Sequence, residues 1–147
     1  MNKSHALLAG LIAALAILSG SAAAGSTTTA IHLKLPGTKS SYVDLGPKGY
    51  SAGDYFVTTG RVLDRATGKP AGRLGGIWTI LSRGADHASF DLGLAHGTLM
   101  VDGKIVHSAP RSVLRVTGGT GTYAGARGTV TFHYLSQTTA ALDIQLH

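Results

Sequence analysis

The chain of 147 residues has no cysteine and no glutamate, and only 14% of its residues are charged. The missing cysteine excludes disulfide bonds, thiolate metal sites and a cysteine nucleophile. Every acidic residue is an aspartate, and these are outnumbered by lysine and arginine, so that the net charge is +6. The basic residues occur singly from Lys34 to Arg127, without aromatic residues interleaved among them. This spacing predicts no nucleic-acid partner and only weak attraction to anionic surfaces.

The one long apolar run lies at the N-terminus, where Lys3 precedes a run of Ala, Leu and Ile at residues 6–18. Three alanines and Gly25 follow, and they supply the small residues that a signal peptidase requires. The run is shorter than the ~20 residues that span a bilayer. We therefore predict a signal peptide of residues 1–24 and one domain of residues 25–147, with an uncleaved anchor as the alternative. The mature protein is expected to be secreted or periplasmic, with no membrane span.

The rest of the chain predicts strands, because no stretch shows a helical period and 21 glycines would weaken any helix. Residues 87–94 alternate apolar with polar side chains, as a half-buried strand does. Asp102 and Gly103 predict a two-residue hairpin, whereas residues 38–51 predict a loop with at most brief pairing. About eight strands with short connections fit either a closed antiparallel barrel or a sandwich.

The faces of the predicted strand at residues 127–135 leave two arrangements open. Thr129, Thr131 and His133 share one face with Arg127, and the apolar side chains share the other. In one arrangement the polar face lines a lumen and the apolar outside is covered by other subunits. In the other, the polar face points to solvent and the apolar face fills an ordinary core.

A glycine-rich stretch at residues 116–128, V-T-G-G-T-G-T-Y-A-G-A-R-G, separates two predicted strands. Gly118, Gly119, Gly121 and Gly128 permit tight turns or a close approach of two chains, and we expect them to shape a loop. The order G-G-T-G-x-[FY]-x-x-A-R-G resembles the signature of plant dirigent proteins and of the related allene oxide cyclase barrels.

Other motifs in the same order extend this resemblance. V-L-D at residues 62–64 and G-R-L-G-G-I-W at residues 72–78 are similar to a dirigent pattern, and residues 142–147 resemble the dirigent C-terminus. The resemblance implies an all-β fold, an eight-stranded antiparallel β-barrel. It also implies a homo-oligomer, commonly a trimer, and a lumen that opens at one end to a small, largely apolar ligand.

The resemblance also supplies catalytic candidates. Asp64 and Arg127 match the lumen aspartate and arginine with which dirigent proteins act on phenolic intermediates. Each has a structural alternative: Asp64 would start a turn through an Asx bond, and Arg127 would tie the glycine loop to backbone carbonyls. Allene oxide cyclase activity is not expected, because the chain has no glutamate and Gly60 and Trp78 replace the implied asparagine and cysteine.

The remaining predicted lumen residues are candidates for contact with a ligand: Trp78, Asp91, Thr129, Thr131 and His133. The seven histidines lack the spacing of metal ligands, so no metal site and no cofactor are predicted. The sequence thus predicts an exported barrel that binds a small apolar or aromatic metabolite and steers its cyclisation or isomerisation. The alternative is a non-catalytic carrier or surface-interaction protein on the same barrel.

Overall fold

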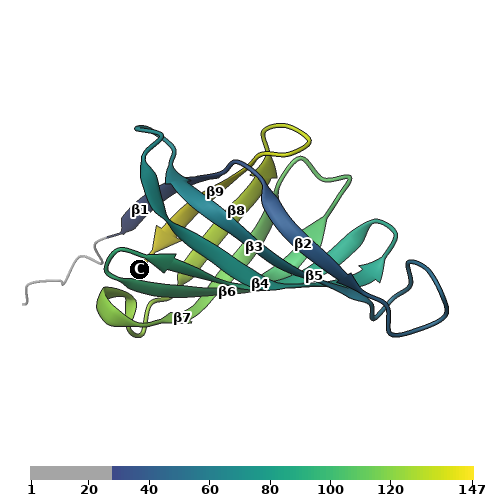
Figure 1. The fold of residues 1–147 in the computed structure, drawn as a ribbon. Coiled ribbons are helices and arrows are strands. Elements are labelled where there is room, and N and C mark those ends of the chain that lie inside the picture. The colour runs from purple at the N-terminus through teal and green to yellow at the C-terminus, as the bar shows by residue number, and fades with distance from the viewer. Residues whose placement is uncertain (1–27) are drawn as a thin grey trace, which may run out of the picture.

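The computed structural model describes residues 28–147, which form nine strands and one short 3₁₀ helix (Figure 1). The predicted signal peptide lies outside the described residues. In chain order the elements are β1 (Thr29–Leu35), β2 (Thr38–Val43), β3 (Tyr55–Asp64), β4 (Pro70–Ser82), β5 (Ala85–Leu94), β6 (Gly97–Val106), β7 (Ser112–Gly119), the helix η1 (Gly121–Tyr123), β8 (Gly128–Tyr134) and β9 (Ala140–Leu146). The described residues contain no helix long and apolar enough to cross a membrane.

One antiparallel sheet closes on itself to form the barrel. Its strand order is β1-β9-β8-β7-β6-β5-β4-β3-β2, and β3 also pairs with β1. Eight strands therefore form a closed ring, and β2 is a ninth strand attached to β3. This confirms the predicted eight-stranded antiparallel barrel and excludes the sandwich.

The ring closes over a short seam between β1 and β3. Only two residue pairs form it, Leu33 with Asp64 and Lys34 with Leu63. After β1 the chain turns at Pro36 and Gly37 and continues as β2, which pairs with the first half of β3. Past the seam, β2 lies at the edge of the sheet and has no partner on its other side among the described strands.

Two local predictions were wrong. Residues 38–43 form β2 rather than a loop, because backbone pairing with β3 holds a strand whose side chains are mostly exposed and polar. Asp102 and Gly103 lie in the middle of β6 rather than in a hairpin, paired with β5 on one side. Asp102 faces outward to bind His87, with 2.8 Å between Oδ2 and Nε2. Gly103 faces Leu114 so closely that a Cβ atom would lie about 3.0 Å from the Leu114 backbone.

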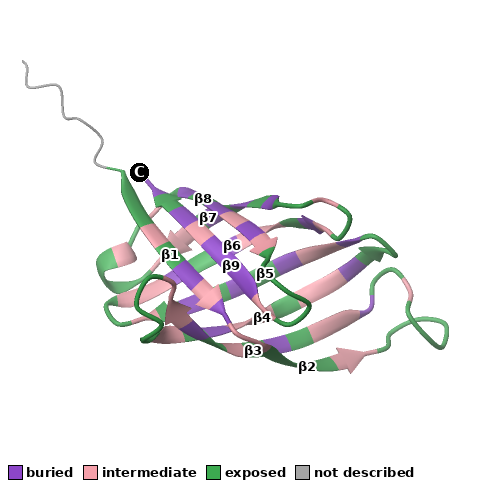
Figure 2. Ribbon diagram, turned by 90° about the horizontal axis from the view of Figure 1, so that it is seen from above, coloured by how far each residue is buried: buried purple, intermediate pink, exposed green. Residues whose placement is uncertain are grey.

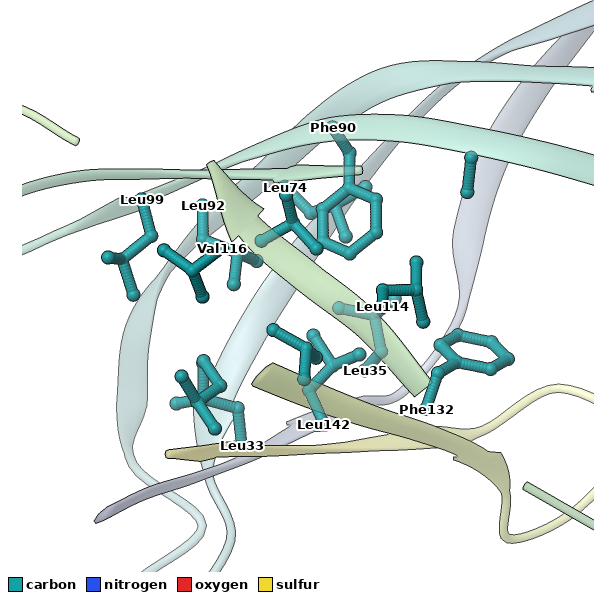
Figure 3. Packing of buried hydrophobic residues seen from close by; sticks show 14 of the residues in the cluster. Leu33, Leu35, Leu74, Phe90, Leu92, Leu99, Leu114, Val116, Phe132 and Leu142 are labelled. Atoms are coloured by element: carbon teal, nitrogen blue, oxygen red, sulfur yellow. The ribbon is translucent and has the colours of Figure 1, made fainter. Parts of the chain in front are cut away.

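The apolar faces of the strands fill the inside of the barrel, which decides between the two arrangements left open by the sequence. Buried and exposed residues alternate along the strands (Figure 2), as period-two side chains on a half-buried sheet do. Side chains from opposing strands meet in the interior (Figure 3). The cluster that they form includes Leu92, Leu99, Leu114, Leu142 and Ile144, which have no exposed surface. The predicted polar-lined lumen is therefore wrong.

The glycine-rich stretch closes one end of this barrel. After β7, the Thr120 N–H donates to the Thr98 carbonyl at 2.8 Å, and the Thr122 N–H donates to the His96 carbonyl at 2.9 Å. Tyr123 of η1 packs against the apolar core. Gly121 has a φ of +60°, and its missing Cβ makes room for the His96 carbonyl. We call this the glycine-loop end, and the termini of the described chain lie there (Figure 1).

Candidate functional site

A cavity of about 480 Å³ opens at the opposite end of the barrel. It lies past the seam between β1 and β3, where β2 is the edge strand, so that no described strand closes the wall between β2 and the turn from β8 to β9. We call it the mouth cavity. Its wall includes inward-facing side chains near the strand ends of this side of the barrel: Phe56, Thr58, Trp78, Asp86, Phe132 and Tyr134.

Aromatic rings make up much of this wall. Trp78 stacks on Phe90 with 5.4 Å between the ring centroids and 6° between the planes. Phe132 meets Tyr134 edge to face at 5.1 Å. Of the nine aromatic residues in the chain, seven contact another ring in the cavity wall, beneath it or in the neighbouring loop. Aliphatic side chains fill the rest of the interior, so the barrel presents its flat ring surfaces at this end.

Asp86 places a carboxylate in this wall and is the one acidic residue among residues 28–147 that lines the cavity. Its side chain is only 14% exposed, and its Oδ2 lies 2.9 Å from Nε2 of His107, in the turn after β6. A second hollow of about 670 Å³ also borders Asp86, and its lining includes His107, Arg83 and Tyr50. The carboxylate therefore stands between two hollows, with an imidazole beside it.

Tyr134 adds a hydroxyl group to the same wall. Burial raises the pKa of this phenol, and the Asp86 carboxylate raises the pKa further through its negative charge. The phenol is therefore neutral at ordinary pH and can donate a hydrogen bond. On the β3 side, the hydroxyls of Ser40 and Thr58 lie 2.9 Å apart and give the wall a second polar spot.

A loop that joins β2 to β3 borders the mouth, and Asp54 organises it. Asp54 is completely buried, and its Oδ2 accepts hydrogen bonds from the Tyr42 hydroxyl at 2.7 Å and from the Ser51 N–H at 2.7 Å. Its Oδ1 accepts from the Leu45 N–H at 2.9 Å. These donors, the Tyr42 hydroxyl above all, hold the pKa of Asp54 well below its usual range. The Tyr42 ring stacks on Tyr50 at 4.9 Å, which ties the loop to the aromatic wall.

The predicted catalytic pair lies at the other end of the barrel. Oδ1 of Asp64 accepts hydrogen bonds from the N–H of Thr67 at 2.7 Å and from its hydroxyl at 2.8 Å, and these bonds lower the pKa of Asp64. Arg127 donates to the carbonyls of Thr117 at 2.9 Å and Ala126 at 2.8 Å. Within residues 28–147 no hydrogen bond or ion pair joins Asp64 to Arg127. Both side chains thus make the contacts of the structural alternatives.

Of the five predicted ligand contacts, Trp78 lines the mouth cavity. The other four, Asp91, Thr129, Thr131 and His133, lie on the outer face of their strands, because their neighbours along the strand fill the core. These four therefore do not line the lumen.

His133 takes part in an outer cluster instead. Its Nδ1 is buried without a hydrogen-bond partner and lies 3.9 Å from Oδ2 of Asp143. Asp143 in turn binds Arg65 and His32. Across the described part of the chain, no group of three histidine or aspartate side chains is arranged to hold a metal ion.

The alternation of apolar residues along β5 is a sequence signal for the inward position of Asp86. The apolar positions 88, 90, 92 and 94 of β5 alternate, and one further step toward the N-terminus reaches Asp86 on the same inward face. The predicted Asp91 has the opposite parity and lies on the outer face. His107 had no such signal, because its partner lies 21 residues away and only the β5–β6 pairing brings the two together.

The chain is similar to several solved structures, although the comparisons by sequence found no match. No family model matches it, and no curated protein matches its sequence. A pyocyanin demethylase has 20% identity and a TM-score of 0.64, over 82% of this chain and 100% of that one. The pterocarpan synthase dirigent protein GePTS1 has 17% identity and a TM-score of 0.68, over 82% and 84%. The Diels–Alderase AbmU from Streptomyces koyangensis has 18% identity and a TM-score of 0.64, over 82% and 63%.

Identities this low show the fold alone. The motifs at residues 62–78 and 116–128 predicted the same fold from the sequence. The chain has the antiparallel barrel fold of dirigent proteins and of the barrel enzymes that resemble them.

Proposed function

We propose that this protein binds a small planar aromatic metabolite in the mouth cavity and steers its cyclisation or isomerisation. The observation that carries the proposal is the Asp86 carboxylate, which is paired with His107 and stands in a cavity wall with four aromatic side chains. A carboxylate beside an imidazole is an acid–base couple, and the aromatic wall selects a flat partner.

Each group in the wall has a distinct task in this proposal. The rings of Trp78 and Phe132 hold the ligand plane in one orientation, which favours one mode of ring closure. The Asp86 carboxylate, which lines the mouth cavity, exchanges a proton with the ligand, and Nε2 of His107 binds the carboxylate and holds it in place. The Tyr134 phenol donates a hydrogen bond to a ligand oxygen that gains negative charge during the step.

The structural neighbours support a ligand of this class. One neighbour is a pyocyanin demethylase, and two are pterocarpan synthase dirigent proteins. Two others are described as a Diels–Alderase and as a cyclase that catalyses a cycloaddition. Their names concern compact ring systems, which match a cavity of about 480 Å³ with stacked rings in its wall. They supply the probe for a first test but not the ligand of this chain.

The position of Trp78 makes this test direct. It is the single tryptophan of the chain and it lines the mouth cavity, so its fluorescence reports on this site alone. We expect saturable quenching by pyocyanin, a flat tricyclic compound, and about tenfold weaker affinity in Phe132→Ala, a loss of about 1.4 kcal/mol. Tyr55→Ala is the matched control, because Tyr55 lies on the outer face of β3. Stearate, which has a flexible alkyl chain, tests whether the site requires a flat ligand.

Three results distinguish the alternatives. Equal quenching by pyocyanin and stearate, unchanged in Phe132→Ala, contradicts an aromatic site. Binding that is intact in Asp86→Asn, with no ligand converted by either form, favours the non-catalytic carrier. Binding that is intact in Asp86→Asn with conversion lost assigns Asp86 to the chemistry.

We also propose that the protein is exported by residues 1–24 and forms a homo-oligomer, most simply a trimer. Val57 and Ile77 support the oligomer: they pair across β3 and β4 on the outer face, and each is 44% exposed. Apolar side chains paired on an outer surface favour cover by another subunit. Light scattering should show an assembly in solution that Ile77→Lys dissociates, and a wild-type protein that is monomeric contradicts the proposal.

A further inference from the structure

A third hollow lies on the outside of the barrel, beside the corner between β1 and β2. This hollow of about 780 Å³ is lined by Lys39 from β2, Arg61 from β3 and Arg73 from β4. The other lining groups are Thr38, Thr59, Leu74 and residues of the corner, and none of them is acidic. Three neighbouring strands thus bring three cations to one hollow.

The register of the sheet places these cations close together. Arg61 of β3 is directly opposite Arg73 of β4, so both side chains rise from the same face. Lys39 is opposite Thr59, which lies two residues before Arg61 and shares its face. Like charges directly opposite each other destabilise a sheet. The protein therefore keeps an unfavourable pair at a position that any neutral residue could fill.

No acidic side chain among residues 28–147 forms an ion pair with these three cations. Within the described residues Arg65 is the only lysine or arginine in an ion pair, so Lys39, Arg61 and Arg73 have no acidic partner. Asp91, on the outer face of β5 opposite Gly75, forms no ion pair with Arg73. A hollow with three uncompensated cations has a positive local field that attracts anions.

We propose that this hollow binds a phosphate or sulfate group carried by a larger organic molecule. Two guanidinium groups on adjacent strands match the oxygens of a tetrahedral oxyanion, and each can donate two hydrogen bonds. The Thr59 hydroxyl and the lysine add further donors. The hollow is much larger than a bare ion, so the rest of the molecule has a place beside the anion. A soluble phosphorylated metabolite and a phospholipid headgroup share this chemistry.

This site does not depend on the function proposed for the mouth cavity. The mouth cavity and the hollow with the three cations share only Gly37 and Thr38. The cations lie on the outer face, away from Trp78 and Asp86. Loss of one activity therefore need not affect the other.

Thermal unfolding tests the anion site with neutral variants of matched size. We expect phosphate and glycerol 3-phosphate to raise the melting temperature of the wild-type protein, because a ligand bound only to the folded state stabilises it. Arg73→Gln and Arg61→Gln should melt no lower than the wild type without anion, since each removes the repulsion between the paired arginines. Both should lose the response to phosphate, with affinity weaker by about tenfold. Arg111→Gln, which changes an exposed arginine in the turn before β7, should respond as the wild type does.

Vesicles identify the source of the anion. If the source is a lipid, the wild type binds vesicles of an equal mixture of phosphatidylglycerol and phosphatidylcholine, glycerol 3-phosphate competes, and Arg73→Gln does not bind. If the source is a soluble metabolite, glycerol 3-phosphate binds and the vesicles do not. A phosphate response that is equal in the wild type, Arg73→Gln and Arg111→Gln is a general salt effect and overturns the proposal, as does the absence of any response.

Discussion

Asp86, in the wall of the mouth cavity, binds His107 with 2.9 Å between Oδ2 and Nε2. The carboxylate also acts on Tyr134, whose pKa it raises in addition to the effect of burial. In Asp86→Asn the negative charge is gone, so the phenolate of Tyr134 becomes easier to form. We expect the pKa of Tyr134 to fall toward the ordinary value of about 10, but to stay above it because the ring remains partly buried.

Ultraviolet difference titration at high pH measures this effect. The Tyr134→Phe variant identifies the tyrosine signal to follow, and Asp102→Asn is the control, because Asp102 binds His87 on the outer face of β5 and β6. A Tyr134 pKa that is the same in the wild type and in Asp86→Asn would show that the carboxylate does not act on the mouth.

Asp54 should make the loop before β3 sensitive to acid. Its carboxylate accepts hydrogen bonds from Tyr42, Leu45 and Ser51, and its pKa in the folded protein is far below the value of about 3.9 that it has when unfolded. Its stabilising effect is therefore complete above about pH 4 and is lost as the pH falls toward the folded pKa. Asp54→Asn removes that effect, because an amide nitrogen cannot accept these hydrogen bonds.

We expect Asp54→Asn to melt several degrees below the wild type at neutral pH. The difference should shrink as the pH is lowered below about 4. Thermal melts over this pH range measure it, with Asp44→Asn in the same loop as the control, since the Asp44 carboxylate accepts a single hydrogen bond there, from Gly49. A difference that does not change with pH would mean that the carboxylate is not the group that stabilises the loop.

Two glycines of the glycine-rich stretch, Gly118 at the end of β7 and Gly121 in η1, should differ in their tolerance of a side chain. Gly121 has a φ of +60°, and a Cβ would collide with the backbone carbonyl of His96. Gly118 has room, because a Cβ would lie 3.8 Å from Sδ of Met100, an ordinary contact. Gly121→Ala should therefore cost about 2 kcal/mol or more in the free energy of unfolding, whereas Gly118→Ala should cost under about 0.5 kcal/mol. Urea unfolding measures both, and equal costs would contradict this account of the loop.

The sequence predicted the barrel well because two signals were strong. Alternation along β5 identified its buried face, and the motif at residues 116–128 implied the closed barrel that the structure has. The motif is tied to the fold by backbone geometry: Gly121 has a left-handed conformation, and Gly128 and Gly119 lie against neighbouring carbonyls. A signature of this kind predicts how the barrel closes at its end and not what the barrel binds.

The errors in the fold have physical causes that local sequence does not carry. Asp102 and Gly103 have the composition of a turn, but β5 and β7 on either side hold them in a strand. β2 lacks an apolar face because it is an edge strand, so no alternation marks it. Both cases are decided by pairing with residues that are distant in sequence.

The site was predicted less well than the fold for the same reason. Trp78 lies in the wall of the mouth cavity, because it is a large apolar residue at an inward-facing position, and its contact with a ligand stays a prediction. The acidic residue at the mouth is Asp86, beside a turn, where the alternation that would have shown its face begins. Its partnership with His107 depends on the register of two strands, and no spacing in the sequence encodes that register.

The last prediction concerns Asp64 and Arg127. Their hydrogen bonds to Thr67 and to the carbonyls of Thr117 and Ala126 hold two turns of the glycine-loop end, at the other end of the barrel from the mouth cavity. The double variant Asp64→Asn, Arg127→Gln should therefore lower the melting temperature by several degrees but leave pyocyanin binding at the mouth within about twofold of the wild type. Asp86→Asn, compared in the same assay, should melt close to the wild type and change what happens to the bound ligand. If the double variant instead abolishes binding while remaining folded by circular dichroism, the ligand site lies at the glycine-loop end, and the mouth cavity has another role.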